Sequence, residues 1–216
     1  MIKYIFWDLD GTVIRSEGGV LSSVRYALDK FNMTLPEEEL RKFIGPSLYD
    51  SFTTRAHMSD EDANKAIAYY REVYGKDGLF DAEVYDGIPE TMQELRNAGY
   101  KHVVVTSKPL IMAERVLEHF KIMPYLETIV GPTPEDRSSD KEKLIRAALD
   151  HFGADRREAV MIGDRCFDID GANAVGTHSI GVLYGYGSKE ELIASGAGQL
   201  AGTPRDIPKV IDKFKN

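Results

Sequence analysis

The chain has 216 residues, 43% of them hydrophobic and 29% charged, which suits one globular domain or a domain with a smaller appendage. Its formal net charge of −8 would repel a phosphate backbone, so we expect no nucleic-acid partner. No apolar run approaches the roughly 18 residues of a membrane-spanning helix. The single cysteine, Cys166, excludes an internal disulfide and a cysteine zinc site and fits a reducing compartment. We therefore expect a cytoplasmic protein that does not bind membranes.

Short apolar runs without polar alternation recur along the chain and predict buried strands. They cover residues 2–7, 102–106, 159–162 and 178–182, with a weaker run at 128–130. Strands that are apolar on both faces are typical of parallel sheets. Helix-like stretches alternate with these runs, and they cover residues 89–97, 109–120, 139–152 and 168–175. This alternation predicts a doubly wound, Rossmann-like α/β core.

One segment interrupts the alternation. A crossover between parallel strands needs only about a dozen residues, yet the first two predicted strands are separated by a much longer stretch. Helices are predicted within it at residues 21–31, 36–43, 48–56 and 60–74, and Pro36 with the three glutamates after it is typical of a first helical turn. We therefore expect a catalytic core of residues 1–15 and 81–216. A helical subdomain of residues 16–80 is inserted after the first strand, above the strand ends where such sheets bind ligands.

Two carboxylates follow the first predicted strand, in the run Asp8-Leu9-Asp10-Gly11-Thr12. Residues two apart in an extended chain project to the same side, so Asp8 and Asp10 would crowd without a cation or a shared proton. A hairpin turn is the alternative, because Asp-Gly between apolar runs is a strong turn signal. A helical segment rather than a matching strand follows Gly11, so we favour a functional site.

Further polar candidates lie at two other strand ends. Asp164 directly follows the strand at 159–162, and a parallel sheet would bring it to the same edge as Asp8. Asp168 follows four residues later and has an alternative role as a helix cap. Thr106 and Ser107 stand between a strand and a helix, where a hydroxyl and free N–H groups form a phosphate-sized anion site. A plain helix cap is the alternative for this pair.

Lys141 lies in the first turn of a predicted helix. Ser139 and Glu142 match a capping box, which would fix the start of that helix. A cation is unfavourable at this positive helix end, which makes sense if Lys141 turns toward a phosphate at the sheet edge. The alternative is a solvated helix face that Lys141 shares with Lys143 and Arg146.

The arrangement and spacing of these motifs closely resemble the haloacid dehalogenase superfamily of aspartyl-nucleophile hydrolases, whose first motif reads DxDGT. The resemblance spans essentially the whole chain. Its four motifs are matched, in order, by Asp8 to Thr12, by Thr106, by Lys141, and by Asp164 with Asp168. Residues 164–192 look like the phosphoglycolate phosphatase-like members, and the inserted segment looks like their helical C1 cap.

The resemblance implies a Mg2+-dependent phosphatase that acts on a small phosphorylated metabolite. By that likeness, Asp8 is the nucleophile and Asp10 the general acid and base. Mg2+ would be held by Asp8, the backbone carbonyl of Asp10 and Asp164, with Asp168 orienting the metal shell. The implied catalytic set also includes Thr106 and Lys141. The implied phosphate-binding set consists of Asp8, Leu9, Asp10, Thr106, Ser107 and Lys141.

Three other functions compete with this interpretation. A sugar phosphomutase of the same superfamily would keep both aspartates, a dehalogenase proper would lack an acid at position 10, and a non-enzymatic member would have lost a motif residue. The substrate is not encoded in these motifs, and the candidates are phosphoglycolate, a 5′-nucleotide and pyrophosphate. Arg41, Lys42 and the turn Gly45-Pro46 are candidate substrate contacts in the insert, with an exposed helix face as the alternative for Arg41 and Lys42.

Overall fold

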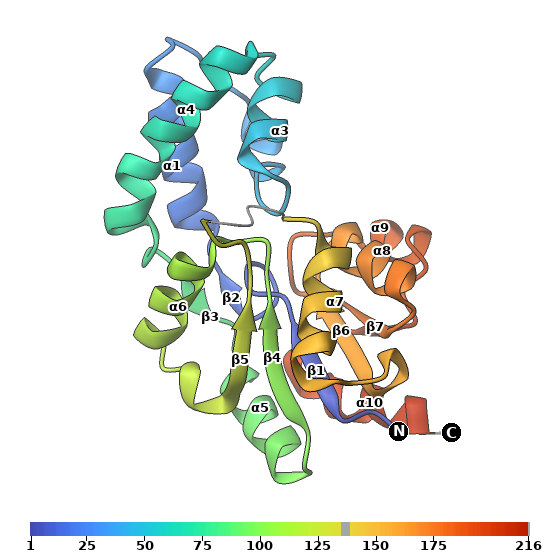
Figure 1. Cartoon of the computed structure of the whole chain (residues 1–216). Helices are drawn as coiled ribbons and strands as arrows, with labels where there is room; N and C mark the ends of the chain where they lie inside the picture. Colours follow the sequence, from blue (N-terminus) through green and yellow to red (C-terminus); the bar gives the residue numbers. More distant parts are fainter. Residues whose placement is uncertain (135–138, 216) are drawn as a thin grey trace. The chain divides into compact units, whose positions relative to one another are not determined.

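The structure is a computed structural model that describes residues 1–134 and 139–215 (Figure 1). The chain divides into two compact units, a larger one of residues 1–15 and 84–216 and a smaller one of residues 16–83. The division falls three residues beyond the expected boundary at residue 80, at the short strand β3 (Glu83–Val84). This strand pairs with β2 (Ile14–Arg15) in a two-stranded sheet, located where the chain leaves and re-enters the larger unit. Neither strand is predicted from the sequence.

A six-stranded parallel sheet in the order β5-β4-β1-β6-β7-β8 forms the larger unit. Its strands are β1 (Tyr4–Trp7), β4 (Lys101–Val105), β5 (Leu126–Val130), β6 (Ala159–Gly163), β7 (His178–Val182) and β8 (Gln199–Ala201). The chain adds β4 and β5 on one side of β1 and then crosses to β6 on the other. Ligands of such sheets bind outside the carboxyl ends of the strands, where the order reverses. The fold therefore predicts a site just beyond β1 and β6.

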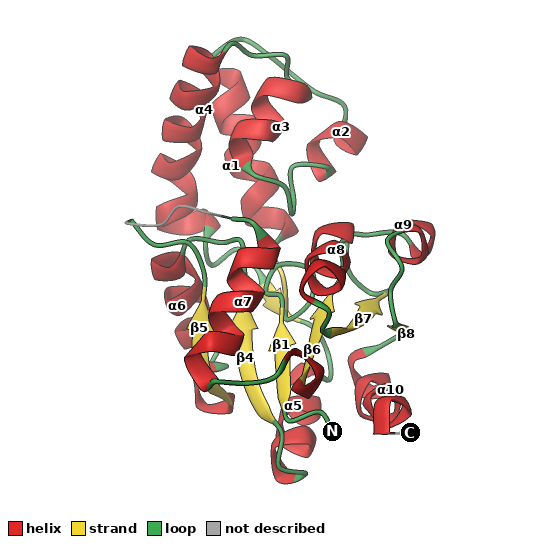
Figure 2. Ribbon diagram, turned by 45° about the vertical axis from the view of Figure 1, so that its right-hand side comes forward, coloured by secondary structure: helices red, strands yellow, loops and turns green. Residues whose placement is uncertain are grey.

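Helices cover both faces of this sheet, which confirms the doubly wound α/β fold. They are α5 (Ile88–Asn97), α6 (Leu110–His119), α7 (Lys141–Phe152), α8 (Cys166–Val175), α9 (Lys189–Ala194) and α10 (Ile207–Asp212). Right-handed crossovers carry α5 and α6 to one face, and α7 and α8 lie on the other (Figure 2). Phe6, Val103 and Met161, from the three central strands, pack under Ile145 of α7 and Ala172 of α8. This apolar contact fixes α7 and α8 at the strand ends that carry the candidate residues.

The smaller unit is helical, as expected. Its helices are α1 (Glu17–Asp29), α2 (Glu37–Arg41), α3 (Leu48–Thr54) and α4 (Asp60–Val73), and α4 runs into a π-helical turn at Tyr74–Gly78. Helix α1 crosses that turn so closely that a Cβ on Gly19 would lie 1.7 Å from the carbonyl oxygen of Gly78. Phe43 and Phe52 meet edge to face with ring centroids 5.1 Å apart. The unit thus has an apolar core of its own.

Several element boundaries differ from the sequence prediction; helix α1, for example, covers Glu17–Asp29 and not residues 21–31. Helix α2 is shorter than the predicted 36–43 at both ends: it begins at Glu37, with Pro36 as the extended residue before it, and it ends at Arg41. Its three glutamates still occupy the first turn, where acids are favourable. Helices α9 and α10 and strand β8 were not predicted, because each is six residues or fewer and lacks a clear apolar period. Among the residues that the structure describes, no helix combines the length and apolar character needed to cross a bilayer.

Candidate active site

The chain turns sharply directly after β1. The N–H groups of Val13 and Ile14 both donate to the carbonyl of Leu9 at 2.9 Å, and Gly11 has a φ of 87°. A Cβ on Gly11 would lie 2.3 Å from Oδ2 of Asp164, so only glycine fits between the two loops. The turn leads into β2, whereas β1 itself pairs with β4 and β6. The hairpin alternative is therefore excluded, and the loop after β1 faces the loop after β6.

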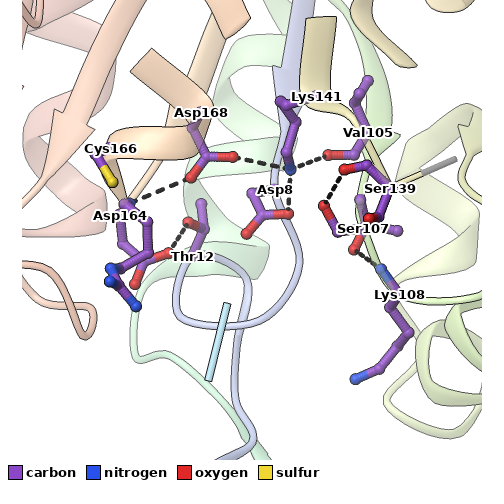
Figure 3. A network of polar contacts seen from close by, with 12 residues as sticks. Asp8, Thr12, Val105, Ser107, Lys108, Ser139, Lys141, Asp164, Cys166 and Asp168 are labelled. Carbon is purple, nitrogen blue, oxygen red and sulfur yellow. Dashed lines mark hydrogen bonds and ion pairs between the residues drawn. The ribbon is translucent and has the colours of Figure 1, made fainter. Parts of the chain in front are cut away.

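Lys141, the first residue of α7, joins an acid that follows β1 to an acid in the first turn of α8 (Figure 3). Its Nζ lies 2.7 Å from Oδ1 of Asp8 and 2.8 Å from Oδ1 of Asp168, and it donates to the carbonyl of Val105 at 3.0 Å. The side chain of Lys141 is buried. A solvated helix face is therefore excluded for this lysine, which instead turns inward to the strand ends.

The predicted cap of α7 is wrong in one detail. Asp140, not Ser139, caps the helix, because its carboxylate accepts the N–H of Glu142 at 2.9 Å. The carbonyl of Ser139 instead accepts the hydroxyl of Ser107 at 3.0 Å. This bond ties the loop after β4 to the start of α7. The backbone N–H of Ser107 can therefore donate to a phosphate, whereas its hydroxyl already donates to Ser139.

Three buried carboxylates lie close enough to share a metal ion. Asp8, Asp164 and Asp168 each offer an oxygen within 4.8 Å of the others. Asp164 also accepts the hydroxyl of Thr12 at 3.2 Å and the N–H of Tyr186 at 2.8 Å, which fix its orientation. Hard carboxylate oxygens are the ligands that Mg2+ and Ca2+ prefer. The residues of this cluster thus fit a divalent cation.

The position of Asp168 differs from the helix-cap alternative. Helix α8 begins at Cys166, so Asp168 lies inside its first turn, and its Oδ2 accepts the N–H of Arg165 at 3.2 Å. The same carboxylate reaches Lys141 with its other oxygen. Asp168 therefore supports the helix start and the acidic cluster together.

Burial dominates the electrostatics of the cluster. Burial raises the pKa of Asp8 to about 7, while the nearby Lys141 acts to lower it and Asp168 to raise it. Burial also raises the pKa of Asp164 well above its usual range, and the charges of Asp168 and Asp8 add to that effect. For Lys141, burial lowers the pKa, but the ion pairs with Asp168 and Asp8 outweigh it and the pKa is raised. The lysine stays charged, and the acids are crowded enough to favour a cation.

A second lysine, Lys108, contacts Asp10 and was not predicted as a site residue. Its Nζ lies 2.6 Å from Oδ1 of Asp10. The N–H of Lys108 donates to the hydroxyl oxygen of Thr106 at 3.1 Å, so the hydroxyl proton of Thr106 can point elsewhere. Asp10 thus turns its carboxylate toward Lys108 and not into the cluster of three acids, and only its backbone carbonyl could serve as the predicted metal ligand. The one sequence signal for Lys108 is its place directly after a strand-end hydroxyl pair.

The candidate contacts of the smaller unit form surface ion pairs. Arg41 lies 3.1 Å from Glu17, and Lys42 lies 2.6 Å from Glu39. The side chains of Arg41 and Lys42 are 62% and 43% exposed. This arrangement matches the exposed helix face that the sequence offered as the alternative.

Acids and a buried lysine meet at the carboxyl ends of the strands, where the order of the parallel strands reverses. Such a site is typical of an α/β enzyme that binds an anionic substrate. The chain belongs to the haloacid dehalogenase-like hydrolases, whose family model matches residues 5–182. Within this family it is a phosphatase, that is, a phosphoric monoester hydrolase.

Two relatives and one solved structure are similar to most of this chain. A 5′-nucleotidase of Pseudomonas aeruginosa is 37% identical over 191 residues, which cover 88% of this chain and 86% of the relative. The tyrosine-protein kinase PtkA of Mycobacterium tuberculosis is 36% identical over 186 residues, which cover 86% of this chain but 63% of that longer protein. The crystal structure of a predicted phosphatase from Clostridium acetobutylicum shares 39% identity over 99% of both chains, with a TM-score of 0.94.

Proposed function

We propose that this phosphatase depends on Mg2+ and hydrolyses a small phosphorylated metabolite through an aspartyl phosphate on Asp8. The observation that carries the proposal is the buried contact of Lys141 with Asp8, next to Asp164 and Asp168. A carboxylate held between a fixed ammonium group and a site for a divalent cation can attack a phosphate ester, because both cations reduce the repulsion between two anions.

The proposed reaction has two steps. In the first, a carboxylate oxygen of Asp8 attacks phosphorus, the bond from phosphorus to the ester oxygen breaks, and Asp10 gives a proton to that departing oxygen. In the second, Asp10 takes a proton from water, the water oxygen attacks phosphorus, and the bond to Asp8 breaks to release inorganic phosphate. The hydroxyl of Thr106 and the ammonium of Lys141 would bind the equatorial phosphoryl oxygens. The N–H groups of Leu9, Asp10 and Ser107 would add further donors.

Asp8 and Asp164, with the backbone carbonyl of Asp10, would hold the Mg2+, and Asp168 would orient this shell. The ion, when bound, supplies positive charge that stabilises the phosphoryl oxygens in the transition state. The charge balance of the site supports this requirement, because four carboxylates stand against the two ammonium groups of Lys108 and Lys141. With all four acids ionised and no divalent cation, a phosphate dianion would enter a site of net negative charge.

The smaller helical unit, residues 16–83, would act as a cap. Such a unit can close over a bound substrate and exclude bulk water until the phosphoenzyme has formed. We expect its residues to contribute to the choice of substrate. The sugar phosphomutase alternative would use the same core but return the phosphoryl group to the substrate.

The test is a phosphate-release screen over a panel of phosphorylated metabolites with Mg2+, repeated with EDTA. Asp8→Asn should abolish the Mg2+-dependent hydrolysis of p-nitrophenyl phosphate while the fold is kept. Asp150→Asn, an exposed acid at the end of α7, is the matched control and should keep full activity. Retention of more than a few per cent of turnover by Asp8→Asn would reject Asp8 as the nucleophile. Appearance of hexose 6-phosphate from a hexose 1-phosphate, or of phosphotyrosine and ADP from a tyrosine peptide and ATP, would assign a phosphoryl transferase instead.

A further inference from the structure

The ion pair of Lys108 with Asp10 is separate from the Lys141 cluster. It joins Nζ and Oδ1 at 2.6 Å, with side-chain exposures of 5% for the lysine and 18% for the aspartate. Burying a lysine at this depth removes most of its hydration, and the ion pair only partly offsets that loss. A buried ion pair is therefore weak evidence of stabilisation, and a lysine buried beside the proposed acid and base points to a function.

The backbone of Lys108 is fixed, so its position is set by the fold. Its N–H donates to the hydroxyl oxygen of Thr106 at 3.1 Å. Two residues further on, the N–H of Leu110 donates to the carbonyl oxygen of Pro132 at 2.9 Å. A Cβ on Gly131 would lie 2.9 Å from the carbonyl oxygen of Lys108, so the loop after β5 presses directly on this segment. Only the side-chain torsions of Lys108 remain to move its ammonium group.

We propose that Lys108 recognises a second anionic group, which the leaving group of the substrate carries two or three bonds from the ester oxygen. This inference rests on the proposed function, because it assigns Asp10 as the acid for that oxygen. A general acid lies within about 3 Å of the atom it protonates. The ammonium of Lys108, at 2.6 Å from the same carboxylate, is then near enough to reach a neighbouring carboxylate or phosphate.

The geometry also links recognition to catalysis. Oδ1 of Asp10 is engaged by Lys108 in this structure. A substrate anion that takes over Lys108 releases Oδ1 toward the leaving oxygen, whereas a neutral leaving group leaves the ion pair in place. Phosphoglycolate and pyrophosphate carry such an anion, and a nucleoside 5′-monophosphate, whose leaving group is a neutral nucleoside, does not. The preferred substrates are therefore small phosphate esters or anhydrides of acids.

The test compares two ligands of similar size that differ in charge, 2-phosphoglycolate and 2-hydroxyethyl phosphate. Their dissociation constants are measured by calorimetry with Mg2+ on Asp8→Asn, which prevents turnover. We expect phosphoglycolate to bind about tenfold to a hundredfold more tightly, the range for a hydrogen bond to a charged group. Adding Lys108→Met should bring the ratio close to one, and adding Lys108→Arg should keep most of it. Lys143→Met, an exposed lysine of α7, is the matched control and should leave the ratio unchanged.

Equal binding of the two ligands to Asp8→Asn, or an unchanged ratio after Lys108→Met, overturns the inference. Adding Asp10→Asn instead removes the partner and keeps the lysine, so the ratio should stay or rise. A fall like that of Lys108→Met would mean that breaking the ion pair merely disturbs the loop, and it also overturns the inference. Because Asp10→Asn breaks the same ion pair, it still tests the inference if Lys108→Met does not fold. Phosphate release by the wild type is measured separately. If Lys108→Met removes the binding preference but the wild type releases phosphate from no ligand, the proposed function is rejected and the recognition by Lys108 is not.

Discussion

Replacing Lys141 by methionine keeps an unbranched apolar side chain, one atom shorter than lysine, but removes its charge. The ammonium lies 2.7 Å from Asp8 and 2.8 Å from Asp168. At an effective dielectric constant of about 20, each of these contacts corresponds to roughly 6 kcal/mol of attraction. Restored hydration of the lysine in the unfolded chain cancels much of this, and removing one partner of a buried ion pair typically destabilises by about 3–5 kcal/mol.

In a chain of this size, about 1 kcal/mol shifts Tm by roughly 2–4 °C, so Lys141→Met should lower Tm by roughly 6–20 °C. The measurement is thermal unfolding in EDTA, followed by the fluorescence of Trp7. This residue is the chain's single tryptophan, is fully buried in β1 and directly precedes Asp8, so it reports on the larger unit. Lys143→Met, on the exposed side of the same helix, should change stability by no more than about 0.5 kcal/mol. A loss of about 1 kcal/mol would lower Tm by at least about 2 °C. A Tm for Lys141→Met within about 2 °C of that control would therefore refute the idea that the buried charge holds the site together.

Three further outcomes are expected. Asp10→Asn should lose most turnover on p-nitrophenyl phosphate while ligand binding to the Mg2+-loaded protein is kept; near-normal kcat would remove its acid and base role. Folding raises the pKa of Asp8 from 3.8 to about 7. The contribution of this carboxyl to the free energy of unfolding of the metal-free protein is therefore fully present at low pH and is lost as the pH rises from about 4 to 7. Added Mg2+ should therefore raise Tm more at pH 8 than at pH 5, and an equal shift would contradict the assignment. Thr12→Val removes the hydroxyl that Asp164 accepts and should weaken Mg2+ binding, measured by calorimetry, about tenfold.

The sequence predicted which strand ends meet, because parallel strands place their carboxyl ends at one edge whatever lies between them. Asp8, Asp164 and Asp168 are brought within reach of one cation, and Lys141 contacts the first and the last of them. Their proposed roles in catalysis remain predictions. The helical insert was readable because its length exceeded that of any crossover and its helices carried clear start signals such as Ser59, which caps α4.

The rest of the site depends on contacts that no local pattern encodes. The N–H of Tyr186 and the hydroxyl of Thr12 hold Asp164 across long stretches of chain, and a backbone N–H leaves no trace in residue type. Lys108 was overlooked because a lysine before a proline resembles any surface cation until its partner is known. The error at Ser139 arose because two adjacent residues, Ser139 and Asp140, are both good caps.

The residues that meet in this site are far apart in the sequence, so the ribosome adds them at widely separated times. Asp8 and Lys141 are 133 positions apart, and Thr12 and Asp164 are 152 apart. While the chain is being synthesised, Asp8 and Asp10 remain hydrated and repel only each other, since Asp164 and Asp168, which will crowd them further, do not yet exist. The repulsion between the two pairs arises only when β6 is added beside β1, at a late stage of assembly. A divalent ion captured at that moment would favour the closing of the sheet, so the supply of metal would govern how readily the newly made chain matures.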